Sequence, residues 1–395
     1  MNMQTMLATQ AQQALARQSG DYVSKDVDEQ AHIDEIMAAG GLSHVYRFDI
    51  GKNTDGVTPL IRGVLSLPET AENVTRNMVE YPDNHFRQLR RQIAMRHGIN
   101  PAHMAFGAGL ESIIDQICRA VLEPDDEVLF PVPNFSVFED MSSRAGAAVI
   151  PVSTSPPNHR WTAATVARIC EVMRRRNPKL IWISNPVNPT GQLLPLATIR
   201  EICEQAERTG TLVAVDEAYG EYTDHEDAVV SATRYLEEYP HLMVLRTFSK
   251  MYALPSARVG YVMCAAQELI QAVNAFRPTF PLPWSSIQMA QIAIMDDPYV
   301  CQCRGRNLRR RNRLLPELQS IPGIQALSTD TNTVMFRHED VPAGSLHEKL
   351  SNRGFLTANL NGVTGIEGSG FLRMTMRSSY ENGLFVRTLR EVANA

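Results

Sequence analysis

Three polar residues follow short apolar runs in the middle of this 395-residue sequence. Asn185 follows the run LIWIS, Asp216 follows LVAV, and Lys250 follows MVLRTFS. Because such runs alternate with helices, they predict a parallel sheet, and ligands bind beyond the carboxyl ends of its strands. We therefore expect an amine, a carboxylate and an amide to line one crevice. Each residue also has a structural alternative: a turn for Asn185, a helix cap for Asp216 and an exposed side chain for Lys250.

The elements that must position these residues alternate along the chain. A helix over 161–176 has its apolar residues on one face, and a second helix ends at Gly210. Buried strands are expected at 127–132, 180–183, 212–215, 243–245 and 259–263. After about Pro283 the pattern changes to an arginine-rich helix and shorter strands, which predicts a second, smaller α+β domain.

Three motifs occur in a fixed order around the polar residues. Residues 185–191 read NPVNPTG, residues 215–219 read VDEAY, and residues 247–261 read TFSKMYALPSARVGY. In this combination the sequence resembles the fold-type I pyridoxal-phosphate enzymes of the aminotransferase class I/II superfamily. The resemblance runs from about Tyr81 to the C-terminus, and weakly from about Arg47. It is closest to the histidinol-phosphate aminotransferase and threonine-phosphate decarboxylase group. It implies an α/β fold with a mostly parallel, seven-stranded sheet between helices, plus a smaller α+β domain built from both chain ends.

The resemblance assigns roles around pyridoxal phosphate. Lys250 is implied to hold the cofactor as a Schiff base and to carry the proton, and Asp216 is implied to keep the pyridine nitrogen protonated. Asn188 and Tyr219 match residues that bind the ring's phenolic oxygen. The implied catalytic residues are thus Lys250, Asp216 and Tyr219, and Thr247, Ser249 and Arg258 belong to the implied cofactor-binding set.

A glycine-rich turn and an aromatic residue complete the implied cofactor site. The run FGAGLES at 106–112 precedes an amphipathic helix, and such a turn offers backbone N–H groups to a phosphate, although a plain tight turn is an equal alternative. By resemblance Gly109, Leu110 and Glu111 contact the phosphate. Phe135 matches the residue that stacks on the pyridine ring, where tyrosine is usual.

Substrate contacts are expected from the two chain ends. Arg373 matches the arginine that clamps the substrate α-carboxylate, with a surface salt bridge as the alternative. Arg377 shares its face if the strand continues, where it either binds a second acidic group or is a solvated strand-end charge. Gly51, Lys52 and Asn53 stand where the family has asparagine-glutamate-asparagine, and Thr54 stands where it has proline. Lys52 and Asn53 are therefore expected to line a pocket for an altered substrate.

Composition limits the partners. The net charge is −5, hydrophobic residues make up 44% and charged residues 21%, and no run approaches a membrane span. We expect no nucleic acid, no membrane and no metal, and we interpret the arginines between 304 and 313 as a solvated helix face. The six cysteines favour a reduced, cytoplasmic setting. Tyr81 resembles the tyrosine that reaches the neighbouring subunit's cofactor, which implies a homodimer with shared sites.

The expected organisation has three parts. Residues 1–70 form an N-terminal arm and part of the small domain, 71–285 the large cofactor-binding domain, and 286–395 an interdomain helix and the C-terminal small domain. The expected function is a pyridoxal-phosphate-dependent aminotransferase acting on an amino acid or an amino-acid-derived substrate, phosphorylated or acidic. One alternative is a lyase similar to threonine-phosphate decarboxylase, favoured by KMYALP, Phe135 and Arg377. The others are another specialised pyridoxal-phosphate enzyme that modifies an amino acid, and a cofactor-bound protein without turnover.

Overall fold

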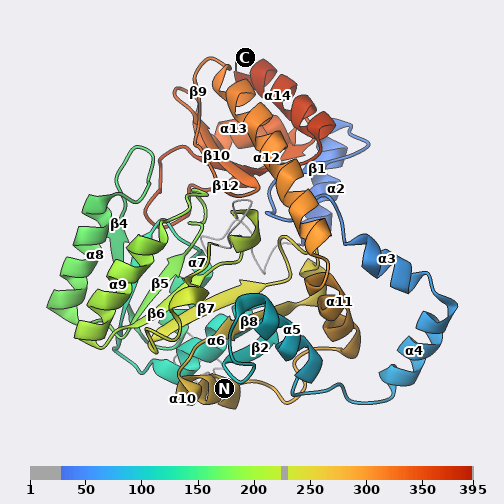
Figure 1. Cartoon of the computed structure of the whole chain (residues 1–395). Coiled ribbons are helices and arrows are strands. Elements are labelled where there is room, and N and C mark those ends of the chain that lie inside the picture. Colours follow the sequence, from blue (N-terminus) through green and yellow to red (C-terminus); the bar gives the residue numbers. More distant parts are fainter. Residues whose placement is uncertain (1–27, 224–229, 394–395) are drawn as a thin grey trace, which may run out of the picture.

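A mostly parallel sheet of seven strands forms the larger body of the computed structural model, which describes residues 28–223 and 230–393 (Figure 1). Only β8 runs antiparallel to its neighbours β2 and β7 in this sheet. The predicted α/β fold with a mostly parallel seven-stranded sheet is therefore confirmed. In spatial order the strands are β2 (Met104–Ala108), β8 (Val259–Met263), β7 (Leu242–Thr247), β6 (Leu212–Asp216), β5 (Leu180–Ser184), β3 (Glu127–Val132) and β4 (Ala148–Ser153).

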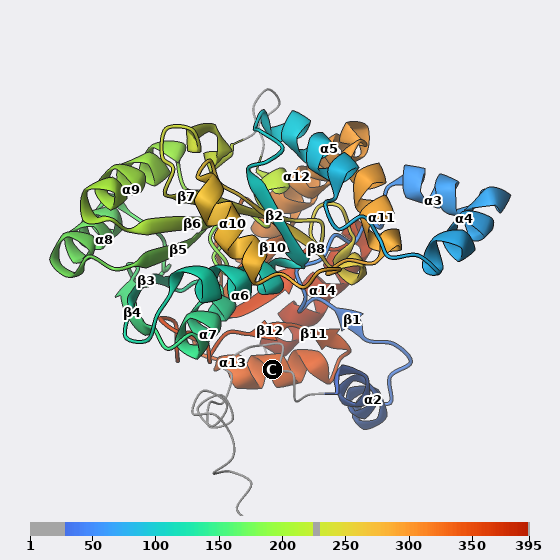
Figure 2. The ribbon, with the colours of Figure 1, turned by 90° about the horizontal axis from the view of Figure 1, so that it is seen from below.

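Helices cover both faces of this sheet because its strands are apolar on both sides. In β5, Trp182 belongs to one apolar cluster, whereas Ile181 and Ile183 belong to the other. Figure 2 shows the two helical layers on opposite sides of the sheet. The first cluster includes α6 (Leu110–Val121), α7 (Ser136–Arg144) and α10 (Gln267–Ala275); the second includes α5 (Arg87–His97), α8 (Ala163–Arg176), α9 (Leu196–Thr209) and α11 (Trp284–Ile294).

A four-stranded antiparallel sheet forms the smaller body, in the order β12 (Ala358–Asn359), β13 (Leu372–Thr375), β10 (Thr333–His338) and β9 (Ile324–Ala326). It packs with α13 (Ala343–Ser351) and α14 (Ser379–Ala393) around its own apolar cluster. The N-terminal segment joins it, because β1 (Tyr46–Arg47) pairs with β11 (Phe355–Leu356) and Phe48 belongs to the same cluster. Residues from both ends of the chain thus build this body.

The long helix α12 (Asp297–Gln319) connects the two bodies. Tyr299 and Cys303 near its start pack in the large cluster, whereas Leu314 and Leu318 pack in the small one. The helices α2 (Glu29–Gly40), α3 (Pro59–Leu65) and α4 (Pro68–Met78) precede the large sheet, and α3 and α4 project from the side of the molecule (Figure 1). No helix in the described ranges is long and apolar enough to span a membrane.

The interpretation of the arginine run as a solvated helix face is wrong for several of its members. Arg306 and Arg310 both pair with Asp55, at 3.2 and 2.6 Å. Arg304 donates to the Glu221 carbonyl, and Arg311 donates to the Thr329 carbonyl. These arginines are engaged because α12 lies between the N-terminal segment and the loop that precedes β10, which the sequence period alone does not show.

Candidate active site

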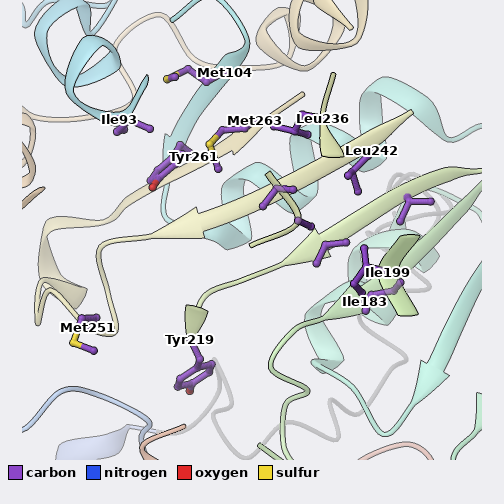
Figure 3. Packing of buried hydrophobic residues seen from close by; sticks show 14 of the residues in the cluster. Ile93, Met104, Ile183, Ile199, Tyr219, Leu236, Leu242, Met251, Tyr261 and Met263 are labelled. Carbon is purple, nitrogen blue, oxygen red and sulfur yellow. The ribbon is translucent and has the colours of Figure 1, made fainter. Parts of the chain in front are cut away.

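The carboxyl ends of β6 and β7 bring polar side chains to one edge of the large sheet. Asp216 is the last residue of β6, Tyr219 lies three residues later, and Lys250 lies in the turn after β7. Figure 3 shows Tyr219 and Met251, the neighbour of Lys250, beyond the ends of these strands. Asn185 does not take part as expected: its side chain exchanges hydrogen bonds with the backbone of Leu194 and closes its own loop, which was the structural alternative.

Asp216 is a buried carboxyl whose charge the fold disfavours. Asp216 is 5% exposed, and burial raises its pKa to about 7. The Ala218 N–H and the positive charge of Lys250 act in the opposite direction and lower this pKa. The Ala218 N–H donates to Oδ1 at 2.8 Å, and no other hydrogen bond from a described residue reaches this carboxyl. Oδ2 is thus available to a cationic N–H donor, which would favour the carboxylate.

Lys250 and Tyr219 face each other at the same edge. The Lys250 Nζ lies 5.2 Å from the centroid of the Tyr219 ring, within the range of a cation–π contact. Tyr219 is buried, and its hydroxyl lies so close to Gly51 that a Cβ at position 51 would collide with it. The N-terminal segment therefore reaches the site, and a glycine at 51 makes room for the phenol.

A glycine-built cradle lies at the start of α6. Gly109 is the N-cap of this helix at φ +83°, without a side-chain cap, so the first backbone N–H groups are not claimed by a capping side chain. A Cβ at Gly109 would collide with the Arg258 guanidinium, and a Cβ at Gly260 would lie 2.6 Å from the Gly109 carbonyl carbon. Toward the described part of the chain, Arg258 makes only long hydrogen bonds of 3.4 Å, to the carbonyls of Pro255 and Ala108. Backbone donors and a guanidinium thus meet in a space that only glycines leave open.

The other predicted phosphate contacts lie around this cradle. Thr247 pairs with Gly260 across β7 and β8, and its Oγ1 lies 3.0 Å from the Ser249 Oγ. Leu110 is buried, whereas the Glu111 side chain is exposed, so only its backbone suits an anion. Two connections therefore converge here: the turn after β2 and the loop between β7 and β8.

Phe135 is fixed at the start of α7. It packs edge-to-face on Phe138 at 5.5 Å between centroids, and its N–H donates to the Asn134 side chain. Asn134 in turn accepts from Ser184 Oγ at 2.6 Å and donates to the Trp182 carbonyl. Asn134 and Ser184 were not predicted; the asparagine directly before the aromatic residue was the available signal.

Arg373 joins the two bodies at the site. Arg373 is 1% exposed. Its Nη1 donates to Asn188 Oδ1 at 2.8 Å, and its Nη2 donates to the Asp49 carbonyl at 3.2 Å. A guanidinium buried in this way is not a surface salt bridge. The geometry places the predicted carboxylate clamp beside the predicted cofactor contact Asn188.

Arg377 is held elsewhere. The strand β13 ends at Thr375, so the condition for a shared face with Arg373 is not met. Its guanidinium pairs with Glu381 at 2.7 Å, donates to the Arg47 carbonyl and lies over the Phe48 ring. The structure therefore does not bring Arg377 together with the other predicted site residues.

Lys52 and Asn53 differ from each other. The Lys52 side chain is half-buried and makes no hydrogen bond or ion pair with any described residue, while its carbonyl accepts from Asn332. Asn53 is buried, and its amide donates to the Met251 carbonyl at 2.7 Å. The Asn53 amide is therefore committed to the lysine turn, and a contact of its side chain with substrate stays a prediction.

Tyr81 lies at the surface of the single chain, 82% exposed and stacked on Phe280 at 4.5 Å between centroids. It takes no part in the site of its own chain. A role toward a neighbouring subunit stays a prediction.

A buried ion cluster supports the site from behind. Arg246 in β7 pairs with Glu217 at 2.6 Å and with Glu221 at 3.0 Å, and all three are almost fully buried. Burial opposes its charge, but the two carboxylates hold the pKa of Arg246 well above its ordinary value. Because Glu217 directly follows Asp216, this cluster fixes the backbone that carries the site carboxyl.

Taken together, the residues fit pyridoxal phosphate. The Gly109 cradle with Arg258 suits a phosphate, and the buried Asp216 carboxyl suits a pyridine nitrogen. The Lys250 amine lies near this carboxyl and the Tyr219 ring, where it can hold the cofactor.

Comparisons with known proteins agree with this geometry. Residues 43–388 match the family model described as aminotransferase class I and II. The histidinol-phosphate aminotransferase of Caldanaerobacter subterraneus is 31% identical over 312 residues, which cover 79% of this chain and 84% of that protein. Among solved structures, the histidinol-phosphate aminotransferase of Sinorhizobium meliloti in complex with pyridoxal-5'-phosphate has a TM-score of 0.78 at 21% identity, covering 94% of this chain and 98% of that one. L-threonine-O-3-phosphate decarboxylase from Porphyromonas gingivalis has a TM-score of 0.70 at 19% identity, covering 88% and 99%. At these identities the two structures show the shared fold.

Proposed function

The chain belongs to the aminotransferase class I and II family and is a pyridoxal-phosphate-dependent aminotransferase, and from this premise we propose how its residues divide the work. The single observation that carries the proposal is that the Lys250 amine and the buried Asp216 carboxyl follow adjacent parallel strands at one sheet edge, near enough for the positive charge of the lysine to lower the pKa of the carboxyl.

Pyridoxal phosphate, when bound, supplies an electron sink that stabilises negative charge at the substrate's α-carbon. Lys250 Nζ holds the cofactor and takes and returns the proton at that carbon. Asp216 Oδ2 accepts a hydrogen bond from the pyridine N–H and thereby keeps the pyridine nitrogen protonated. Backbone N–H groups of the Gly109 turn and the Arg258 guanidinium bind the phosphate. Tyr219 and Asn188 bind the phenolic oxygen, and Phe135 covers one ring face.

Arg373 orients the substrate. A buried guanidinium binds a carboxylate through two parallel hydrogen bonds, which fixes the α-carbon relative to the lysine amine. Asn188, which accepts from Arg373 at 2.8 Å, links this clamp to the ring contact. Substrate position and cofactor position are thus set by one pair of side chains.

The proposed substrate is an amino acid or an amino-acid-derived compound with an acidic or phosphorylated side chain. Relatives are named for histidinol phosphate, a phosphorylated amine. Lys52 is a cation without a partner among the described residues and lies next to Gly51, which contacts Tyr219. We propose Lys52, rather than Arg377, as the cation for the second anionic group.

We also propose that the active unit is a homodimer in which each subunit contributes to the partner's site. The proposed location of the protein is the cytoplasm. Tyr81 lies among exposed apolar residues, including Leu67, Met78 and Val79, close to the projecting α3 and α4. All six cysteines are free and five of them are buried, as suits a reducing compartment.

The test is incubation of the purified protein with a panel of amino acids and phosphorylated amines, with and without 2-oxoglutarate. We expect a keto or aldehyde product that depends on the acceptor, and none from a Lys250→Ala variant. Carbon dioxide release without an acceptor would replace transamination by the decarboxylase alternative. Arg377 was one of the features that favoured the decarboxylase alternative, but its guanidinium forms an ion pair with Glu381.

A further inference from the structure

The segment 51–58, here called the N-terminal strap, crosses from the small body to the edge of the large sheet and is anchored along α12. Asp55 pairs with Arg306 and Arg310. The Tyr299 hydroxyl donates to the Gly56 carbonyl, and the Thr58 hydroxyl donates to Asp296. These contacts fix the course of the strap independently of the site.

Asn53 is the point at which the strap reaches the lysine. It is 8% exposed, and its amide nitrogen donates to the Met251 carbonyl at 2.7 Å. The same nitrogen lies 3.3 Å from the Tyr299 hydroxyl, and the amide oxygen accepts from the Asp55 N–H at 2.9 Å. Both ends of the side chain are therefore used, and its orientation is determined.

The Met251 carbonyl belongs to the turn that carries Lys250. Within this turn the Ala253 N–H donates to the Lys250 carbonyl at 3.0 Å, and Ala253 adopts φ +56°. The next carbonyl, that of Met251, receives its hydrogen bond from Asn53, almost two hundred positions earlier in the chain. A buried carbonyl without a partner costs free energy, so losing this donor favours a rearranged turn.

We propose that Asn53 is a positioning residue for Lys250: by holding the Met251 carbonyl, it sets the direction of the lysine backbone and the amine presented to the cofactor. The inference rests on the proposed function, in which Lys250 holds pyridoxal phosphate. The N-terminal strap thus orients the lysine amine through Asn53. Its first residue, Gly51, leaves room for the Tyr219 hydroxyl because glycine has no side chain.

The test compares Asn53→Asp with Asn307→Asp. The first change removes the donor to Met251 and keeps the acceptor for Asp55. The second is a matched control, since Asn307 is a 5% exposed asparagine of α12 that donates to the Thr331 carbonyl at 3.1 Å, away from the lysine turn. Asn53→Ala is the second variant, which removes the donor without adding a charge. The measurements are the Kd of pyridoxal phosphate for the cofactor-free protein, the pH titration of the absorbance band near 400 nm, and hydrogen exchange of 248–254 without cofactor.

We expect both Asn53 variants to raise the Kd by about tenfold, the effect of one buried hydrogen bond. Their absorbance titration shifts, and exchange of 248–254 becomes faster even without cofactor. Asn307→Asp lowers the thermal midpoint and leaves all three measurements unchanged. Wild-type values in a folded Asn53 variant, or an equal loss in Asn307→Asp, would overturn the inference. If the wild-type protein binds no pyridoxal phosphate, the proposed function fails, while the exchange measurement still decides whether Asn53 holds the turn.

Discussion

Replacing Asp216 by asparagine removes a carboxyl group whose protonation is coupled to folding. In the cofactor-free protein burial raises the pKa of Asp216 to about 7, whereas an unfolded aspartate has a pKa near its ordinary value of 3.8. The folded state therefore binds this proton more tightly than the unfolded chain does. Its contribution to stability is present at low pH and is lost as the pH rises through about 7.

The magnitude follows from the two pKa values. From about pH 5.5 to about pH 7 the folded carboxyl still holds its proton while the unfolded one has lost it, so stability falls by about 1.4 kcal/mol per pH unit over roughly 1.5 units, which gives about 2 kcal/mol. Above about pH 7 both states are deprotonated, and about pH 8 samples that plateau. The asparagine has no proton to lose, and its amide oxygen still accepts from the Ala218 N–H. Relative to the wild type, Asp216→Asn should therefore be more stable by about 2 kcal/mol at the higher pH than at the lower one.

The assay is urea unfolding of both cofactor-free proteins at these two pH values, followed by circular dichroism. Comparing the two proteins cancels titrations that they share, such as those of the histidines. Parallel dependence of stability on pH in the two proteins would refute the reasoning, since it would mean that Asp216 has the same pKa folded and unfolded.

Three further predictions concern the cradle, the substrate clamp and the ion cluster. Gly109→Ala places a Cβ against the Arg258 guanidinium and should raise the Kd of pyridoxal phosphate at least about tenfold, measured by isothermal titration calorimetry. Gly98→Ala is the control, because Gly98 also has a positive φ but has open space around it, and this variant should leave the Kd unchanged. Equal effects of the two variants would contradict the assignment of the Gly109 turn to the phosphate. Arg373→Lys should raise KM for the amino substrate by roughly ten- to a hundredfold in steady-state assays, whereas Arg377→Lys should change it less than about twofold, and the reverse order would exchange their roles. Arg246→Met leaves two buried carboxylates unpaired and should lower the free energy of unfolding by about 3–5 kcal/mol in urea, so a loss below about 1 kcal/mol would show that the cluster is solvated.

Local patterns determined the fold prediction because each strand is a short apolar run between helical periods. The runs LIWI and LVAV became β5 and β6, and the residue after each occupies the sheet edge. The helix predicted over 161–176 begins two residues later, at Ala163, because the Thr162 side chain caps it.

Pairwise contacts between distant segments could not be predicted in the same way. Arg377 was expected on the face of Arg373 by strand period, but the strand ends at Thr375 and Glu381, four residues ahead on α14, takes the guanidinium. Asn53 donates to Met251, which is distant in sequence, and nothing in a local run indicates which carbonyl an amide will reach. Arginines of α12 looked solvated because Asp55 and the Thr329 carbonyl approach them only in the folded chain.

Lys250 holds pyridoxal phosphate in the proposed function, and borohydride reduction of the cofactor-bound protein tests this role most directly. The lysines of the chain are Lys25, Lys52, Lys179, Lys250 and Lys349, so peptide mass mapping separates them clearly. We predict that reduction fixes the cofactor to the peptide that contains Lys250, that Lys52→Ala leaves this labelling intact, and that Lys250→Ala abolishes it. Cofactor fixed to Lys52, or labelling that persists in Lys250→Ala, would contradict the account.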